Sequence, residues 1–302
     1  MMYNIIQGSD FVEFDRRKYI ELIQQRKFDD ADMYRIENIP KKLYKFMYLS
    51  DLPKCKEKCE LENLNDIKIK SIENSEFWLS TCKNLNDPFE LKTLFLEEEK
   101  INKYNYPIEL INQLKYSHYY GVLIGCFTTN LDNSMPMWAH YANNHRGFCI
   151  EYNIKKPKFF YPISYEGERA PANVAYMNCL TLIAKEIKGK ITEEEKEDLD
   201  FYNTLLFHNS IIKDNSWEYE NEYRLLFPRL LANKFVNVTE NGAAIANAVL
   251  GIEIGGIYIG MSCDEIYKDR LIKVGNKLGI NVYQMFFDDR ASKYKLSYKT
   301  IE

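Results

Sequence analysis

Seven short runs rich in aromatic and branched residues constrain the fold of this chain more than any other feature. They are EFWLST, GVLIGCFTT, GFCIEYN, YRLLFP, GGIYIG, INVYQMFF and YKLSYK, a composition typical of β-strands. Several of them follow one another without a long crossover helix, which favours a mixed or antiparallel sheet over a doubly wound parallel one. The sequence therefore predicts an α+β fold with a mixed or antiparallel central sheet.

Apolar residues at helical spacing predict the helices that flank this sheet, over residues 88–99, 104–115, 134–144, 171–188, 193–213 and 263–278. Residues 10–37 carry two shorter helical patterns, and Pro40 closes that segment. We therefore predict an N-terminal helical arm over residues 1–40, followed by a single α+β domain over residues 41–302.

The composition is that of a packed globular protein, because 46% of the 302 residues are hydrophobic and 28% are charged. The formal net charge is −4, so no overall basic field indicates nucleic-acid binding, although a local basic patch remains open. The N-terminal residues do not resemble a signal peptide, and no run approaches the roughly 18 apolar residues that span a bilayer. We expect a cytoplasmic protein that does not enter a membrane.

The cysteines and histidines lack the spacing of metal ligands. Cys55 and Cys59 are four positions apart, but no second pair follows them. His140 and His145 are five apart, whereas zinc-binding helices place two histidines four apart on one face. We predict no metal site, and we expect His140 to lie in the interior with its hydrogen bonds satisfied.

The segment N-D-P-F-E at residues 86–90 has the features of a helix start. Asp87 is a candidate N-cap, Pro88 suits the first helical position, and Glu90 completes a capping box. A second interpretation stays open, in which Ser80, Asn86 and the free amides of the helix start face a phosphate-bearing ligand.

The segment W-E-Y-E-N-E-Y-R at residues 217–224 carries the most suggestive charge pattern. If it is a strand, or leads into one, Glu218, Glu220, Glu222 and Arg224 share one face, opposite Trp217, Tyr219 and Tyr223. Crowded carboxylates repel one another, so one of them should have a raised pKa unless Arg224 or a substrate compensates. Two interpretations remain: a solvated edge with an ion pair, or a carboxylate at the mouth of a cleft.

Several enzyme classes are not supported by motifs. The chain has no G-x-S-x-G elbow, no H-E-x-x-H and no phosphate loop of the G-x-x-x-x-G-K type. GIEIGGIYIG leads into a strand rather than a helix, so it is not a dinucleotide-binding fingerprint.

Taken together, the motifs resemble a bacterial domain-of-unknown-function family, number twenty-nine seventy-one. The motifs that carry the resemblance are L-Y-K at 43–45, F-W-x-S at 77–80, N-D-P-F-E at 86–90, M-W-x-H-Y-x-x-x-H-x-G-F at 137–148, W-x-Y-E-x-E-Y-R at 217–224 and I-Y-x-G at 257–260. They occur in order over about residues 43 to 298. The resemblance implies a role in prokaryotic conflict or abortive-infection systems, and so in phage defence or as a toxin.

The chain also resembles ADP-ribosyltransferases in three short segments of the sequence. These are Tyr44–Lys45 in an early strand, Trp78–Ser80 in a middle strand and Glu220-x-Glu222 before a late strand. Lys45 departs from the pattern, since a histidine is expected there. The resemblance implies a split sheet and NAD as the cosubstrate, with a carboxylate stabilising the oxocarbenium-like transition state.

This resemblance assigns roles to particular residues. Glu222, Glu220, Ser80 and Tyr44 are expected to be catalytic. An aromatic side chain would stack on nicotinamide, and Arg146 or Arg224 would bind the pyrophosphate. The residues expected to bind the cosubstrate are Lys45, Trp78, Asn86, Asp87, Trp138, His140, Arg146 and Arg224. The partners implied are a protein or nucleic-acid acceptor and an antitoxin or phage-derived trigger.

Two other functions remain open. One is a nuclease or phosphoester hydrolase that uses Asp87, His140 and Glu220 or Glu222, and it requires a metal or a histidine in the same cleft. The other is a non-catalytic sensor or adaptor, which predicts an exposed apolar patch in place of a convergent polar pocket.

Overall fold

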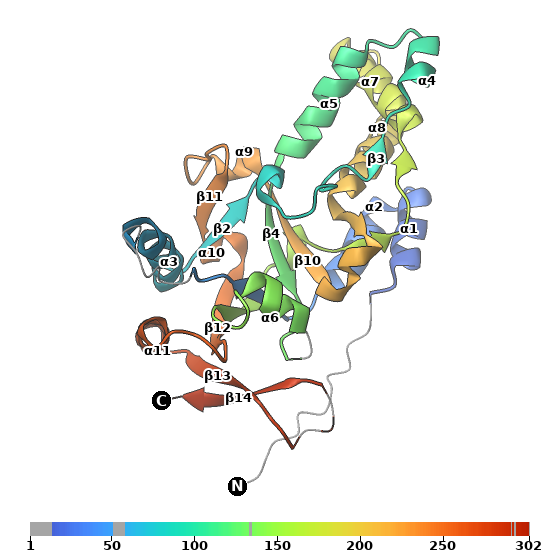
Figure 1. Ribbon diagram of the computed structural model, residues 1–302. Coiled ribbons are helices and arrows are strands. Elements are labelled where there is room, and N and C mark those ends of the chain that lie inside the picture. The colour runs from blue at the N-terminus through green and yellow to red at the C-terminus, as the bar shows by residue number, and fades with distance from the viewer. Residues whose placement is uncertain (1–13, 51–57, 133–134, 291, 293, 302) are drawn as a thin grey trace.

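The computed structural model describes residues 14–50, 58–132, 135–290, 292 and 294–301, and Figure 1 shows the course of the chain. The strands are β1 Lys42–Met47, β2 Glu76–Ser80, β3 Leu94–Phe95, β4 Val122–Thr128, β5 Phe148–Ile154, β6 Phe160–Pro162, β7 Ser164–Glu166, β8 Ala170–Pro171, β9 Ile212–Asp214, β10 Glu222–Pro228, β11 Gly242–Ala246, β12 Ile252–Ile259, β13 Asn281–Phe287 and β14 Leu296–Ile301.

The α-helices are α1 Arg16–Gln24, α2 Phe28–Glu37, α3 Lys58–Glu73, α4 Glu98–Lys103, α5 Ile108–Tyr120, α6 Met135–Tyr141, α7 Asn173–Ile187, α8 Glu193–Phe207, α9 Arg229–Ala232, α10 Asn247–Leu250 and α11 Glu265–Leu278. Short 3-10 helices are η1 Cys82–Asn84, η2 Pro157–Phe159, η3 His208–Ile211 and η4 Asn215–Glu220. In the described part of the chain, no helix is long and apolar enough to cross a membrane.

Within the described residues, ten strands form one central sheet in the order β11-β2-β4-β1-β5-β12-β13-β14, with β10 paired to β4 and β6 paired to β10. Neighbouring strands are antiparallel except β12 and β13, which are parallel. Each of the seven predicted runs overlaps a strand of this sheet. The predicted α+β fold with a mixed sheet is confirmed.

The sheet opens beside β4. One edge of β4 pairs with β10 from Thr128 to Val122, so this pairing covers the whole strand. Its other edge pairs with β1 only at Tyr44 and with β2 only at Ser80. β1 and β2 therefore diverge from β4, and the backbone between them leaves room for side chains.

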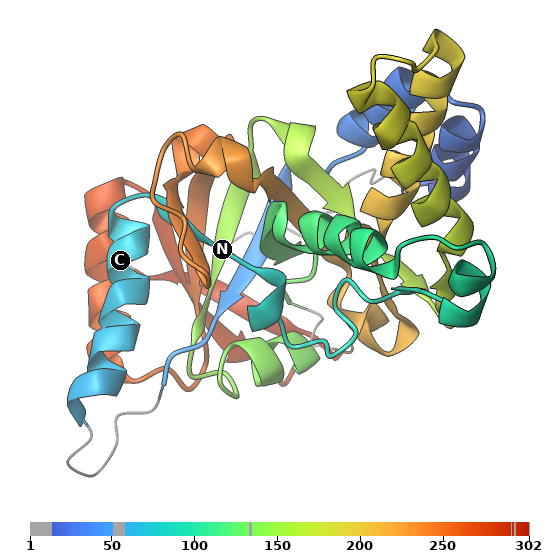
Figure 2. The same ribbon diagram turned by 90° about the horizontal axis from the view of Figure 1, so that it is seen from above.

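Alternation along the strands divides the sheet into two faces. One face packs against α3 and α11, which lie side by side in both views, through Ile72 and Leu271 among others (Figures 1 and 2). The opposite face packs against α6, where Phe46 meets Trp138 in an edge-to-face contact with ring centroids 4.9 Å apart. The polar residues of interest lie on this second face.

Helices α4, α5, α7 and α8 form a lobe beside the sheet, whereas the short α9 and α10 lie against its strands. α7 packs on α8 and α5, with Tyr176 and Leu206 buried among them. α1 and α2 form a pair next to α8 and outside the sheet, and Tyr19, Ile23 and Ala31 are their buried residues (Figure 2). The predicted helices of the arm are present from residue 16 onward, and residues 1–13 lie outside the described part.

Three predicted helices need correction. Residues 88–95 form a turn and the short strand β3, and helix begins only at Glu98, the first residue of α4. The predicted helix 104–115 is shifted to α5, since Pro107 precedes its first turn. The predicted helix 193–213 ends at Phe207, and β9 contains its last residues. For the helix predicted at 134–144, α6 covers residues 135–141, and Ser134 lies outside the described residues.

Candidate functional site

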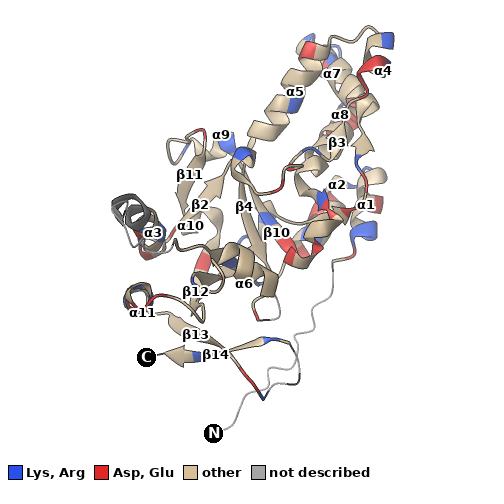
Figure 3. Cartoon of the chain, viewed as in Figure 1, with Lys and Arg blue, Asp and Glu red and all other residues tan. Residues whose placement is uncertain are grey.

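A cavity of about 200 Å³ lies on the α6 face of the sheet, where β1 and β2 diverge from β4. Side chains from the sheet form its floor, and α6, the 84–90 segment and residues near η4 form its walls. Its polar and charged lining consists of Tyr44, Lys45, Ser80, Asn84, Asn86, Asp87, Glu90, Thr128, Tyr141, Lys213, Glu220, Glu222 and Arg224. Lys, Arg, Asp and Glu positions meet around β10 in Figure 3.

The backbone before β10 positions two carboxylates in different ways. Glu222 and Arg224 are two apart on the strand and share its cavity face, as the period of two predicts. Glu220 lies in η4, and Asn221 follows in the left-handed region with a φ of 44°. The predicted strand does not extend back to Glu218, which is exposed. Glu220 therefore reaches the cavity from a helical turn rather than from the strand.

Arg224 is fully buried, and every N–H of its guanidinium is used. Nε donates to Glu222 at 2.9 Å, Nη1 donates to Glu90 at 2.5 Å and to the Ser210 carbonyl at 2.8 Å. Nη2 donates to Glu90 at 2.8 Å and to Glu222 at 3.2 Å. Guanidinium has five N–H donors, so none remains for a pyrophosphate, and the expected phosphate contact from Arg224 is absent from this arrangement.

Lys213 joins the two carboxylates that the sequence singled out. Its buried ammonium pairs with Glu220 and lies 3.2 Å from Glu222. The Tyr141 hydroxyl, from α6, donates to the other oxygen of Glu220. One ammonium thus holds Glu220 and Glu222 together, and the tyrosine orients Glu220.

The two carboxylates have pKa values displaced in opposite directions. Burial, and then the charge of Glu222, raise the pKa of Glu220. Burial would also raise the pKa of Glu222, but Arg224 and Lys213 outweigh it and lower the pKa to about 2. Neighbouring carboxylates with separated pKa values are typical of an acid or base paired with a permanently ionised partner.

Lys45 enters the opening in the sheet. Its ammonium lies 3.4 Å from the Cys126 carbonyl of β4 and 4.9 Å from the ring centre of Phe77. Burial lowers the pKa of Lys45, and the charge of Glu222 opposes that shift. Tyr44, the residue before Lys45 on β1, donates its hydroxyl to Glu151 at 3.4 Å.

The 86–90 segment contributes a turn rather than a helix start. The Asp87 carboxylate accepts the Phe89 amide at 2.8 Å, as a cap would, but residues 88–91 form a turn. The Glu90 carboxylate does not accept the backbone N–H of Asp87, because both of its oxygens bind Arg224. The predicted capping box is wrong, since a buried arginine competes better for this carboxylate than a backbone amide does.

Eight of the twelve residues singled out by sequence line the cavity, namely Tyr44, Lys45, Ser80, Asn86, Asp87, Glu220, Glu222 and Arg224. Trp78 does not line it, but its indole donates to Ser80 at 3.2 Å. Trp138 is fully buried and donates to the Leu131 carbonyl at 2.8 Å, so it supports α6.

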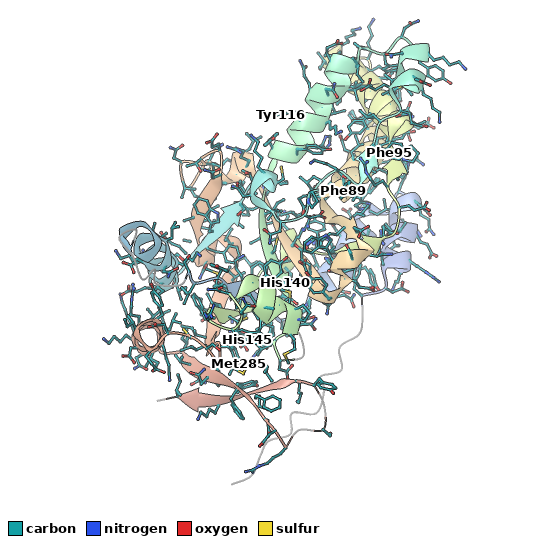
Figure 4. The ribbon with its side chains drawn as sticks, in the orientation of Figure 1. Phe89, Phe95, Tyr116, His140, His145 and Met285 are labelled. Carbon is teal, nitrogen blue, oxygen red and sulfur yellow. The ribbon has the colours of Figure 1, made fainter. Side chains whose placement is uncertain are left out.

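His140 and Arg146 lie outside the cavity lining, and both are exposed. His140, labelled on α6 in Figure 4, has its Nδ1 3.2 Å from the Tyr219 hydroxyl. The expectation of an interior histidine is therefore wrong. Over the residues described, no group of three or more His, Cys, Asp or Glu side chains is arranged to hold a metal ion. Cys55 and the Cys59 side chain fall outside the described part.

Lys213, Tyr141 and Glu90 line the cavity but were not predicted for it. Lys213 falls at the end of a predicted helix, and nothing local distinguishes it. Glu151 does not line the cavity but accepts the Tyr44 hydroxyl, and it carries a signal, because it is a single carboxylate inside the apolar run of β5. It is 6% exposed and accepts the Tyr258 hydroxyl at 3.0 Å.

The family with the description "Protein of unknown function (DUF2971)" matches residues 137–225. This segment is similar to the DUF2971 family. The resemblance found in the sequence is thereby confirmed for these residues. The matching segment extends from α6 into β10 and contains Tyr141, Lys213, Glu220, Glu222 and Arg224. Comparison with curated proteins gives no match, comparison with solved structures gives none either, and the ADP-ribosyltransferase resemblance finds no support there.

Proposed function

We propose that this protein cleaves the N-glycosidic bond of NAD and transfers ADP-ribose to a macromolecular acceptor. The observation that carries the proposal is the pair formed by Glu220 and Glu222. The pKa of Glu220 is raised and that of Glu222 is lowered, and the Lys213 ammonium binds both carboxylates. Glycosyl transfer needs an ionised carboxylate beside the forming cation and a second group that handles a proton.

The charge of the cavity supports this choice of reaction. The part of its lining that the structure describes has four carboxylates, Asp87, Glu90, Glu220 and Glu222, against the three cations Lys45, Lys213 and Arg224, a net charge of −1. Lys213 and Arg224 are already paired with carboxylates. Such a cavity favours the cationic nicotinamide ring and an oxocarbenium-like ribose over a phosphodiester. It therefore supports ribosyl transfer better than the nuclease alternative.

The proposed reaction balances without a further reagent. The bond between ribose C1′ and the pyridinium nitrogen breaks, and nicotinamide leaves as a neutral molecule with the electron pair. The acceptor's oxygen or nitrogen forms the new bond to C1′, and its proton passes to Glu220. Glu222 stays ionised throughout and stabilises the positive charge on the ribose.

The size of the cavity limits which part of NAD it receives. About 200 Å³ is below the roughly 300–1,000 Å³ of typical small-molecule sites. We expect the nicotinamide riboside end to enter and the adenosine end to lie outside, toward the exposed Asn84 and Asn86.

The surroundings of the cavity suit an acidic acceptor, such as single-stranded nucleic acid. Arg169 donates to the Lys92 carbonyl at 2.6 Å and lies 5.9 Å from the ring of Phe89, which is 51% exposed. Burial, and then the charges of Arg169 and Lys92, lower the pKa of Lys115. Figure 4 labels Phe89 on the turn and Tyr116 on α5. Cations interleaved with aromatic rings are typical of single-strand binding.

The decisive experiment measures nicotinamide release from NAD, with single-stranded DNA, single-stranded RNA or bacterial protein extract as the acceptor. Glu220→Gln should lower the rate by about a hundredfold or more, because it removes the proton acceptor. The acidic limb of the rate profile should lie above the usual glutamate pKa of about 4.3, because burial raises the pKa of Glu220.

Glu218→Gln is the matched control, since Glu218 is exposed and does not line this cavity. It should turn over NAD at the wild-type rate. A folded Glu220→Gln protein with full activity would contradict the role of Glu220. A wild-type protein that releases no nicotinamide with any acceptor would contradict the function. Growth arrest on expression, abolished by Glu220→Gln, is the outcome expected for a toxin in phage defence.

A further inference from the structure

A second cavity, of about 240 Å³, lies between the helical arm and the sheet. α1 and α2 bound it on one side, and β6, β7, η3 and the start of β10 bound it on the other. Its polar lining is formed by Arg16, Tyr19, Arg35, Tyr161, Ser164, Tyr165, His208, Glu218, Asn221 and Glu222. The function proposed above uses none of these residues except Glu222.

Arg35 lies at this cavity, and its Nε is a donor without a partner among the described residues. It is only 1% exposed, and its terminal nitrogens bind the Phe160 carbonyl at 2.5 Å, the Lys158 carbonyl at 3.1 Å and Asp32 at 3.0 Å. Its Nε is buried and has no hydrogen-bond partner in the described part of the chain. A buried guanidinium N–H without an acceptor is costly, which indicates that something else supplies the acceptor.

His208 presents a second unused group at the same cavity. The residue is 6% exposed, and its Nε2 has no partner among the described residues. Burial, and then the charge of Arg16, lower the pKa of His208 to about 4. The ring is therefore neutral at physiological pH, and its Nε2–H tautomer offers a donor without adding charge.

Arg16 adds a third donor and a positive charge to the cavity. It pairs with Glu166, but its side chain is 39% exposed, so it can turn toward a ligand. Of the carboxylates in the lining, Glu218 is exposed and Glu222 is held by Arg224 and Lys213. The groups left without a partner at this cavity are thus donors.

We propose that this cavity binds a small oxyanion, the phosphate or carboxylate group of a metabolite, through Arg35 Nε, His208 Nε2 and Arg16. The ligand would tie α1 and α2 to η3, because these three donors come from separate elements.

The second cavity is connected to the first through Glu222 and one of its hydrogen bonds. Tyr165, which lines the second cavity, accepts the backbone N–H of Glu222 at 2.7 Å, and Glu222 lines both cavities. A ligand at the arm would therefore contact the elements that position the carboxylate pair, although its binding does not depend on the proposed reaction.

The test is calorimetric titration of the full chain, in a buffer without other oxyanions, with inorganic phosphate and with malonate. Saturable binding of one ion per chain is expected for at least one of them. Saturation by phosphate would indicate a phosphoryl ligand, and saturation by malonate a carboxylate ligand. His208→Leu and Arg16→Gln should each weaken binding about tenfold or more, since each removes a donor.

Arg17→Gln is the matched control, because Arg17 is exposed on the same helix and does not line the cavity. It should bind as the wild type does. His208→Leu should melt no lower than the wild type, since its Nε2 has no partner to lose. If that variant does not fold, Arg16→Gln decides alone. The proposal is overturned if neither anion saturates the wild type, or if both variants bind like Arg17→Gln.

Discussion

Glu222 illustrates how closely stability and function are joined at single residues of the first cavity. It is 3% exposed and is bound by both Arg224 and Lys213. If Glu222 were neutral, the buried cations Arg224 and Lys213 would each lose one of their two carboxylate partners. A side chain placed to stabilise a transition state is here also a structural counter-charge.

We expect Glu222→Gln to lower the free energy of unfolding by about 3–5 kcal/mol, the range seen when one partner of a buried ion pair is removed. Urea denaturation at pH 7 measures it. Glu218→Gln, at an exposed carboxylate, should change stability by less than about 0.5 kcal/mol. Equal stability of the two variants would show that the ion pairs of Glu222 contribute nothing to folding.

The same residue gives a pH dependence of known sign. The pKa of Glu222 is lowered to about 2 in the folded state, against 4.5 for the free side chain. Its contribution is complete above about pH 4.5 and is lost as the pH falls through 2. Glu90 and Glu220 have raised pKa values, so their contributions change above about pH 4.5, outside this window. The free energy of unfolding, plotted against pH between 2 and 4.5, should therefore be flatter for Glu222→Gln than for the wild type.

At the scale of elements, the turn at 88–91 brings Glu90 to Arg224. Asp87 is 6% exposed and accepts the Phe89 amide, and Leu91 adopts a positive φ of 54°. The turn thus depends on the acceptor oxygen of Asp87. The negative charge of Asp87 is a separate feature, which adds to the charge of the cavity lining.

Asp87→Ala should lower the free energy of unfolding by about 1 kcal/mol, because it removes that acceptor. Asp87→Asn should keep nearly all of the stability, since asparagine makes the same turn. Thermal or urea melts of the two variants distinguish these outcomes. If Asp87→Ala is as stable as the wild type, the side chain does not hold the turn, and its role lies in the cavity alone.

At the scale of the whole molecule, the arm and the sheet have separate cores. Tyr19, Ile23 and Ala31 form the buried centre of the arm, and they do not belong to the clusters that cover the sheet faces. The arm reaches the sheet through Arg35 and the second cavity. Local opening of the arm should therefore be possible while the sheet stays closed.

Ile23→Ala should destabilise the arm by about 2–4 kcal/mol, because Ile23 is 3% exposed and its loss leaves a void. Hydrogen exchange should then speed up in α1 and α2 and stay unchanged in β4 and β5. Met33→Ala, at a residue 59% exposed, serves as the control. Faster exchange throughout the sheet would show that arm and sheet open as one unit.

Local patterns determined most of the secondary structure and part of the candidate site. Runs of aromatic and branched residues identified seven strands. The period of two placed Glu222 and Arg224 on one face, because side-chain direction along a strand depends only on neighbouring residues. The same reasoning failed for residues 88–99 and for Glu220, where the local signals fitted more than one backbone conformation.

Only the tertiary structure decided which charges meet. Glu90 binds Arg224 across 134 positions of the chain, and Tyr141 reaches Glu220 across 79. No local pattern records such pairs, yet a buried charge without a partner is so costly that its partner controls the backbone nearby. That is why Glu90 binds Arg224 instead of completing the expected capping box, and why Lys213 binds both carboxylates of the pair. Sequence alone therefore determined seven strands of the sheet and the shared face of Glu222 and Arg224, whereas long-range charge pairing determined the site.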